Sequence, residues 1–372
     1  MMIHVVNNFV SSTVHASLIA VLSKTVKDQL VIIPIRDHNH KGLNSDGLGD
    51  VQFKYILFNN RVIKYFPLFK VFLVSVRCYF SLRSAKKASE IDGEKLKVIA
   101  HNFWSDGMVA FFNSFFIPMR YMMVVRNTDI NYFVARLPHY RWLMGWAIKR
   151  SAGLSFVSKS HYLRFKARWP SLLSCARKVE IIPNAVSDWW LDNLLTEPLA
   201  RGKQACFVGR FDANKNLKNL VLAAQLVYDA MPEFRLVLVG GSEEEFCAAT
   251  GCRAVPGFVV VCGRLPKEEL LKVYRRSRLF VMPSFTETFG LVYLEALSQG
   301  CAVICSSGEG IDGMWEVPFI RSVEPESVDD IARTIVELVA AFPEGIPVSW
   351  STAQVGKFSW TQTADEYLGF FS

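Results

Sequence analysis

The chain has 372 residues, of which 51% are hydrophobic and 20% are charged. This length exceeds what one hydrophobic core usually supports, and the composition excludes a disordered chain, so we expect two globular domains. Basic residues predominate over residues 1–200 and acidic residues slightly over the remainder, for a net charge of +8. Such a basic half is typical of proteins that bind a negatively charged partner, such as nucleic acid, an anionic membrane or a phosphorylated substrate.

The cysteines indicate the cellular compartment and whether a metal site is expected, and the lengths of the apolar runs indicate whether a helix can span a membrane. The eight cysteines include no C-x-x-C pair, and most lie in apolar runs such as "ACFVG" and "VVVCG". They are typical of small core residues in a reducing compartment, and no metal site is expected. The N-terminus lacks the features of a signal peptide, and no uninterrupted apolar run reaches the roughly 18–20 residues of a spanning helix. We therefore expect a cytoplasmic protein, with peripheral contact to the inner face of the cell membrane as an open alternative.

The first half predicts an α/β domain. A strand at 2–8 precedes a helix at 13–24, and further strand candidates are "QLVIIPI", "KLKVIAHN", "RYMMVVRN" and "GLSFVS". Residues 62–90 predict a long amphipathic helix with Lys and Arg among aromatic residues. Such a helix can rest on anionic lipid, or it can be an ordinary solvated helix packed on the sheet.

The second half predicts alternating strands and helices. Strands are expected at 204–209, 234–240, 258–263, 278–284 and 302–307, and helices at 216–230, 242–249, 266–277, 289–299 and 327–341. The strands are continuous β-branched runs, which favours a doubly wound parallel sheet covered on both faces. Its ligand should bind at the carboxyl ends of the strands.

The domain limits follow from these elements. We expect an N-terminal Rossmann-like domain over 1–185 and a linker over 186–203, where prolines, a glycine and polar residues separate strand-like runs. A C-terminal Rossmann-like domain is expected over 204–355, followed by a terminal helical segment over 356–372.

Two motifs place cations after predicted strands. "VGRFDANKN" contains Arg210 and Lys215, which suit a diphosphate because fixed cations neutralise charge on a leaving group. "CGRLPKEEL" contains Arg264 and Leu265, where a flat guanidinium can hold a base. The alternative for each motif taken alone is an ordinary solvated loop.

The stretch "PSFTETFGLVYLEALSQG" carries two carboxylates. Glu287 lies in a turn into a helix, and Glu295 lies about two helical turns further on. Together they can bind two polyol portions of one extended ligand, and Gly290 lets the backbone approach it. The alternative is that Glu287 caps the helix and Glu295 forms a surface ion pair. The glycine-rich "GEGIDGMWE" follows another strand and suits phosphate or sugar, or is a flexible connection.

These motifs, in this order, resemble the retaining nucleotide-sugar glycosyltransferases of family 4 (glycosyl transferases group 1). The resemblance begins at "IIPNAVSDWW" and continues through "ETFGLVYLEALSQGCAVICSS". Its last matching segment is "FSWTQTADEYLGFF". It implies the GT-B fold, in which two Rossmann-like doubly wound domains face each other across a cleft and a C-terminal helix crosses back to the first domain. "NNFVSSTVH" lacks the Gly-Gly loop that family members often have, and Pro183-Asn184-Ala185 stands where they often have P-N-G.

The resemblance also implies roles by position. Arg210 and Lys215 would bind the donor diphosphate and stabilise it as leaving group. Glu287 would contact the transferred sugar, and Glu295 would accept hydrogen bonds from the ribose. Backbone N–H groups around the sugar and phosphate would belong to Thr288, Phe289, Gly290 and Leu291, and Arg264 and Leu265 would lie beside the base.

Three residues of the first half are also candidates. His101 ends a strand in "VIAHNFW", and family members commonly have a histidine near the donor sugar here; a buried histidine is the alternative. Arg126 and Asp129 follow another strand in "VVRNTDINYF" and are candidates for acceptor or sugar contacts, with helix capping by Thr128 or Asp129 as the alternative.

The expected function is retaining transfer of a sugar from a nucleotide diphosphate sugar to an acceptor hydroxyl. The acceptor would be a lipid-linked or growing glycan in bacterial surface polysaccharide synthesis. Cofactors are not expected, and because no D-x-D motif appears, we expect metal independence. The alternatives are a GT-B nucleotide-sugar epimerase or hydrolase, and a non-enzymatic basic protein that binds nucleic acid. The sequence has no recognisable nucleic-acid-binding motif, which disfavours the second alternative.

Overall fold

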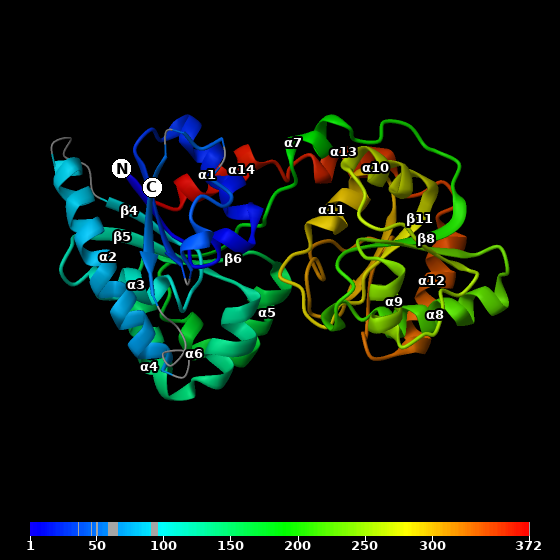
Figure 1. Ribbon diagram of the computed structural model, residues 1–372, viewed down its shortest axis with the longest axis horizontal. Helices are drawn as coiled ribbons and strands as arrows, with labels where there is room; N and C mark the ends of the chain where they lie inside the picture. The colour runs from blue at the N-terminus through cyan, green and yellow to red at the C-terminus, as the bar shows by residue number, and fades with distance from the viewer. Residues whose placement is uncertain (36, 46, 50, 59–65, 91–95, 372) are drawn as a thin grey trace. The chain divides into compact units, whose positions relative to one another are not determined.

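The chain folds into two compact units, each described here by itself (Figure 1). The structure is a computed structural model that describes residues 1–372 except 36, 46, 50, 59–65, 91–95 and 372. Unit 1 comprises Met1–Val157, His161–Asn184 and Trp360–Ser372. Unit 2 comprises Ser158–Ser160 and Ala185–Ser359.

Unit 1 is built on a parallel sheet with the strand order β3-β2-β1-β4-β5-β6-β7 in the described residues. Val5 of the central strand pairs with Ile32 on one side and Ala100 on the other. The inner strands are buried on both faces, which explains their continuous apolar runs. The strands are β1 (Met2–Val5), β2 (Gln29–Ile35), β3 (Gln52–Leu57), β4 (Leu96–Ala100), β5 (Met119–Val125), β6 (Gly153–Phe156) and β7 (Val179–Ile181).

Helices cover this sheet. The helices are α1 (Thr13–Thr25), α2 (Pro67–Glu90), α3 (Gly107–Asn113), α4 (Arg141–Arg150), α5 (Lys159–Arg168), α6 (Pro170–Leu173) and α14 (Trp360–Gly369). The C-terminal helix α14 packs against α1 and buries Trp360, Ala364 and Tyr367. The predicted return of the C-terminal helix to the first domain is thus confirmed.

Unit 2 is built on a second parallel sheet with the order β10-β9-β8-β11-β12-β13. Its strands are β8 (Gly202–Val208), β9 (Arg235–Val239), β10 (Val259–Val261), β11 (Ser277–Val281), β12 (Ala302–Ser306) and β13 (Ile320–Val323). Its helices are α7 (Asp188–Asp192), α8 (Leu217–Ala230), α9 (Glu243–Thr250), α10 (Lys267–Arg276), α11 (Leu291–Ser298), α12 (Val328–Ala341) and α13 (Val348–Val355). The predicted pair of doubly wound α/β sheets is confirmed.

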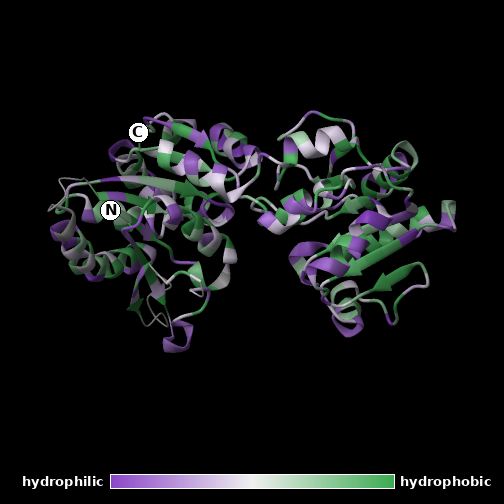
Figure 2. Ribbon diagram, turned by 90° about the horizontal axis from the view of Figure 1, so that it is seen from above, coloured by the Kyte–Doolittle hydropathy of each residue, from purple (hydrophilic) through white to green (hydrophobic). Residues whose placement is uncertain are grey.

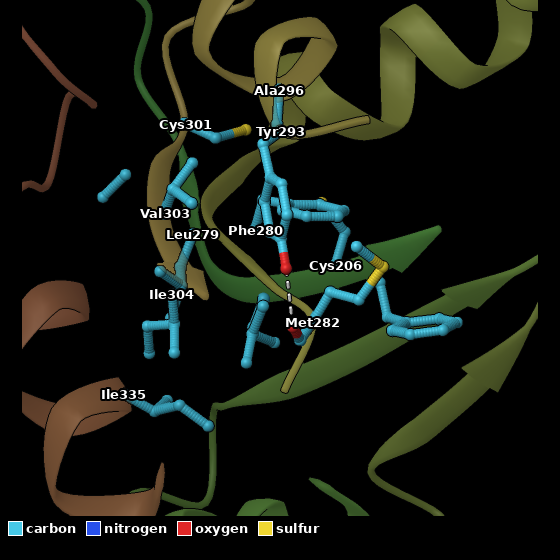
Figure 3. Close-up of a cluster of buried hydrophobic side chains, with 14 of the residues drawn as sticks. Cys206, Leu279, Phe280, Met282, Tyr293, Ala296, Cys301, Val303, Ile304 and Ile335 are labelled. Atoms are coloured by element: carbon cyan, nitrogen blue, oxygen red, sulfur yellow. Dashed lines mark hydrogen bonds between the residues drawn. The ribbon is translucent and has the colours of Figure 1, made fainter. Parts of the chain in front are cut away.

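The core of unit 2 fixes the position of α11. Tyr293 of α11 is buried among side chains of β11 and β12, and its hydroxyl donates a hydrogen bond to the carbonyl of Met282 at 2.9 Å (Figure 3). Met282 directly follows β11, so this bond joins the start of α11 to the end of the strand. The connecting segment 283–290 is therefore held at both ends.

Helix surfaces in both units mix apolar and polar residues along their length, as helices packed on a sheet do (Figure 2). Within the described residues, no helix is long and apolar enough to span a bilayer.

Several boundaries differ from the sequence-based expectation. The expected linker contains α7, and the helix expected over 62–90 begins at Pro67, with residues 62–65 outside the described part. β3, β7 and β13 were not predicted. β3 alternates exposed and partly buried residues over most of its length, and β7 has only three residues, so neither forms a long apolar run.

Candidate active site

The loops that carry the sequence motifs of unit 2 follow the carboxyl ends of parallel strands. β8 and β11 are neighbours in the sheet, and β12 lies next to β11. Because all strands point the same way, the loops after them meet at one edge of the sheet. The amino acids predicted to bind phosphate and sugar lie on the loops at this edge.

Lys215 and Glu287 form an ion pair at this edge. Lys215 Nζ lies 2.6 Å from Glu287 Oε2, and each side chain is only 15% exposed. The two residues are 72 positions apart in the chain. The structure therefore brings together the predicted phosphate-binding lysine and the predicted sugar-binding glutamate.

Two asparagines tie the loop after β8 to the loop after β11. Asn214 Oδ1 accepts a hydrogen bond from the Thr286 amide at 3.1 Å, and Asn216 Nδ2 donates to the Pro283 carbonyl at 3.0 Å. Asn216 also has φ +55°, a left-handed conformation that asparagine tolerates, at the start of α8. These bonds fix the backbone on both sides of the ion pair.

Arg210 lies on the loop that carries Lys215 but is largely open to solvent. Its side chain is 81% exposed, and its guanidinium pairs with Asp212 at 3.2 Å. Asp212 in turn accepts a hydrogen bond from the Lys215 amide at 3.2 Å. Arg210 is thus free to rotate toward a bound anion, whereas Lys215 is held in place.

A second carboxylate holds the backbone of Glu287. Glu309, in the glycine-rich loop after β12, accepts a hydrogen bond from the Glu287 amide at 2.8 Å. The Gly310 amide donates to the Glu287 carbonyl at 3.1 Å. Gly310 has φ +55°, which favours glycine there. Sequence reasoning marked this loop for its glycines and missed Glu309.

The turn into α11 ends at a glycine. Gly290, with φ +78°, is the residue before the helix, and α11 begins at Leu291. Phe289 is buried in the core, and Thr288 donates its amide to its neighbour Glu287 at 3.1 Å. The helix start leaves amides available to an oxygen-rich ligand.

Glu295 lies on α11, against α10. The Tyr274 hydroxyl donates to its Oε2 at 3.3 Å. Burial raises the pKa of Glu295 to about 7, and the hydrogen bond from Tyr274 and the charge of Lys267 only partly offset this effect. The carboxyl therefore changes its charge near neutral pH.

Arg264 lies at the rim of a shallow hollow of about 390 Å³ beyond β10 and β9. The hollow is lined by Gly241, Ser242, Glu245, Gly263 and Arg264. Arg264 is exposed and Leu265 is partly buried next to it. This arrangement offers a flat guanidinium beside open space.

In unit 1, His101 is buried in a chain of three histidines. His101 Nε2 lies 3.1 Å from His4 Nδ1, and His101 Nδ1 lies 3.2 Å from His15 Nδ1. His4 Nε2 lies 2.8 Å from Gln29 Oε1, an acceptor. Burial lowers the pKa of His4 to about 4 and those of the other two well below their ordinary value, so all three rings are neutral at pH 7.

The neutral state fixes the tautomer of each ring. A neutral imidazole has one donor and one acceptor nitrogen. Since Gln29 Oε1 accepts from His4 Nε2, His4 Nδ1 must accept from His101 Nε2, and His101 Nδ1 must accept from His15 Nδ1. Within the described residues, no group of three or more His, Cys, Asp or Glu side chains is arranged to hold a metal ion.

Arg126 and Asp129 fasten the loop after β5 to the loop after β4. Arg126 Nε donates to the His101 carbonyl at 2.8 Å. Asp129 is buried and accepts hydrogen bonds from the amides of Phe103, Trp104 and Arg126 at 2.9–3.1 Å. The structure gives the Asp129 carboxylate a structural role, and acceptor contact by either residue stays a prediction.

A pocket of about 170 Å³ opens beside these loops. Its wall includes Trp104, Tyr132 and Phe133, together with Lys70 and Asp106. Asp106 accepts from Asn102 Nδ2 at 2.8 Å, and burial raises the pKa of its carboxyl to about 7. Aromatic walls with a few polar groups are typical of small-molecule pockets. None of these residues was predicted, because no motif marks them.

Residues 197–341, which contain the Lys215–Glu287 pair, match the family model of glycosyl transferases group 1. These residues belong to that family. The chain is 32% identical over 177 residues to the O-antigen chain mannosyltransferase B of Escherichia coli, covering 44% of this chain and 45% of that protein. It is 34% identical over 178 residues to the D-inositol 3-phosphate glycosyltransferase of Segniliparus rotundus, covering 44% of this chain and 38% of that protein. The chain thus spans about half or less of the length of these curated relatives.

Solved structures of similar fold cover the whole chain. The lipopolysaccharide outer core galactosyltransferase WaaB, in its apo form, has a TM-score of 0.71 at 15% identity, over 100% of this chain and 99% of that chain. A structure titled trehalose-6-phosphate from E. coli, bound with UDP-2-fluoro glucose, has a TM-score of 0.71 at 13% identity, over 99% and 98%. The fold of the chain is GT-B, as the resemblance predicted.

The pKa of Glu295 leads to a testable expectation about nucleotide binding. If Glu295 accepts hydrogen bonds from the ribose, the ionised carboxylate binds better than the neutral acid. Raising the pH from 6 to 8 should therefore tighten nucleotide binding, because the pKa is near 7. Glu295→Gln should weaken binding about tenfold at the high end of this range, since hydrogen bonds to charged groups are the stronger ones.

Calorimetric titration of the nucleotide across this pH range checks the expectation. Glu268→Gln, an exposed carboxylate on α10, is the control and should leave the profile unchanged. A Glu295→Gln variant with the wild-type pH dependence would show that another group is responsible.

Proposed function

We propose that this protein is a retaining glycosyltransferase that moves a sugar from a nucleotide diphosphate sugar to an acceptor hydroxyl. The observation that carries the proposal is the Lys215–Glu287 pair at the strand edge of unit 2, inside the residues that match the family. A cation and a carboxylate at one edge suit a ligand that carries both a diphosphate and hydroxyl groups.

The residues have distinct roles in this proposal. Lys215 and the exposed Arg210 neutralise the charge that develops on the departing phosphate. Amides at the start of α11 contribute to the same oxygens. Glu287, held by Glu309, accepts hydrogen bonds from the transferred sugar, and Glu295 accepts them from the ribose.

Bond formation follows from this placement. The bond between the anomeric carbon and the phosphate oxygen breaks with its electron pair going to the phosphate, which leaves as the nucleotide diphosphate. The acceptor oxygen bonds to the anomeric carbon on the same face. Its proton passes to the leaving phosphate oxygen, so no protein base is required.

A lipid-linked or growing glycan of bacterial surface polysaccharide is the proposed acceptor. Two proteins of similar sequence or fold are named as an O-antigen mannosyltransferase and a lipopolysaccharide galactosyltransferase. The pocket of unit 1 has the exposed ring of Tyr132 in its wall, on which a sugar can stack.

A donor screen tests this function. Purified protein is examined by thermal shift with uridine, guanosine, adenosine and thymidine diphosphates, and then for release of nucleotide from the matching sugars with and without a lipid-linked glycan. Acceptor-dependent product with retained anomeric configuration is expected. Conversion of the donor without acceptor indicates an epimerase or hydrolase, and salt-dependent binding to random DNA with no donor binding indicates a nucleic-acid-binding protein.

A further inference from the structure

The helix α2 carries two apolar stripes, of which only one is buried. The first stripe packs in the core of unit 1 and consists of Val71, Val74, Cys78, Leu82 and Ala85. These residues are spaced three or four positions apart, as expected for one face of a helix. This stripe accounts for the attachment of α2 to its unit.

The second stripe has the same spacing but faces solvent. It consists of Phe69, Phe72, Val76 and Phe80, with Phe66 just before the helix also exposed. Phe80 is 68% exposed. Large aromatic residues in a continuous exposed row are unusual on a soluble surface and mark an interaction site.

The row continues across a groove onto α3. α2 packs against α3, and a groove of about 510 Å³ lies between them. Phe116, which is 74% exposed, and Phe115 rise from the end of α3 at one side of this groove, and Phe72 and Phe80 line the other. The groove wall is almost wholly apolar.

The next helix extends the same face. Phe115 also lines a second hollow, which it shares with Trp146, Lys149 and Arg150. Trp142 and Trp146 lie one turn apart on α4 and are both exposed. Since α3 packs against both α2 and α4, these helices are neighbours (Figure 1). Their exposed aromatic residues form one surface, here called the aromatic face.

The charges of the aromatic face are all positive. Arg83 and Lys87 continue the exposed stripe of α2 by three and four positions and are exposed. Arg150 lies over the Phe115 ring at 4.5 Å. The sequence contains no Asp or Glu over residues 66–89, 107–128 or 130–179, which include the described parts of all three helices except the last residue of α2.

We propose that the aromatic face docks on an anionic lipid bilayer. Phenylalanine rings can enter the acyl boundary, tryptophans favour the headgroup level, and Arg and Lys pair with lipid phosphates. A second copy of the chain is a poorer occupant, because two such faces would bring Arg83 and Lys87 of each copy against like charges. The proposal does not depend on the donor chemistry of unit 2.

Vesicle co-sedimentation tests the proposal. The full chain is mixed with phosphatidylcholine vesicles, with or without phosphatidylglycerol, at low and high ionic strength. Binding is expected only to the vesicles that contain phosphatidylglycerol, and more weakly at high salt. Phe80→Ser/Phe116→Ser and Arg83→Glu/Lys87→Glu should each lower the partition coefficient by about tenfold or more.

Matched controls come from unit 2. Leu222→Ser/Leu226→Ser removes two exposed apolar side chains of α8, and Arg253→Glu/Lys357→Glu reverses two exposed cations. Both should bind vesicles as the wild type does. Thermal melts show that each variant is folded, and release of nucleotide from donor without vesicles shows that unit 2 is intact.

A second measurement follows tryptophan emission. Spin-labelled phosphatidylglycerol should quench tryptophan emission of the wild type, and Trp142→Phe/Trp146→Phe should remove most of that quenching. The proposal is overturned by absence of vesicle binding at low salt, by equal binding to uncharged vesicles, or by equal loss in the unit 2 controls. It is also overturned if the face variants convert a dimer to a monomer and leave vesicle binding unchanged.

Discussion

Replacing Lys215 with alanine is expected to lower the turnover of sugar transfer about 100- to 1,000-fold, the usual effect of removing one group that stabilises developing charge. The ammonium lies 2.6 Å from Glu287 and is largely shielded from solvent, so water cannot easily replace it. The substitution also leaves Glu287 without its partner, which further opposes binding of a diphosphate. Steady-state rates with the identified donor and acceptor measure the effect.

Lys218→Ala is the matched control, since it removes the same charge from an exposed position on α8. It should keep near-normal turnover. Circular dichroism and a thermal melt establish that Lys215→Ala is folded. A folded Lys215→Ala variant with near-normal turnover would show that the lysine does not act on the leaving group.

Gly240→Ala is expected to lower the free energy of unfolding of unit 2 by about 3 kcal/mol or more. Gly240 follows β9 with φ +125°, and its amide donates to the Gly263 carbonyl at 2.6 Å. A Cβ atom there would lie 2.2 Å from the Gly209 carbonyl oxygen, which is backbone and has little room to move. Because Gly209 precedes Arg210, donor binding should weaken as well.

Gly257→Ala serves as the comparison, because a Cβ at Gly257 meets no atom within 4 Å. Its stability should stay within about 0.5 kcal/mol of the wild type. Scanning calorimetry of both variants, with nucleotide titration of each, gives the two readouts. Equal stability of Gly240→Ala and Gly257→Ala would contradict the expected backbone clash.

The sheets were predictable where strands are buried on both faces. β2 and β12 are wholly buried, and such strands appear in sequence as unbroken apolar runs. β3, by contrast, is an edge strand with exposed Gln52 and Lys54, so its sequence has no such run. β7 and β13 are also edge strands, with three and four residues. Their pairing depends on the strand beside them rather than on their own residues.

Some contacts of the candidate site were predictable from the sequence and others were not. The proximity of Lys215 and Glu287 was predictable because both follow parallel strands, and strand ends share one edge. Glu309 and the partners of His101 were not, because hydrogen bonds between distant residues follow no periodic pattern. Only the folded backbone shows that His4, His15 and His101 meet.

The order of segments in the chain has a consequence for synthesis on the ribosome. Unit 2 interrupts unit 1 in sequence, and it closes on itself where the Val186 amide bonds to the Phe358 carbonyl at 3.0 Å. The partner of α1 is α14, which follows unit 2 in the chain. Domains usually fold in the order in which they leave the ribosome. Unit 1 cannot complete its packing until α14 has been synthesised. We therefore expect unit 2 to fold before unit 1 does, although unit 1 begins earlier in the chain.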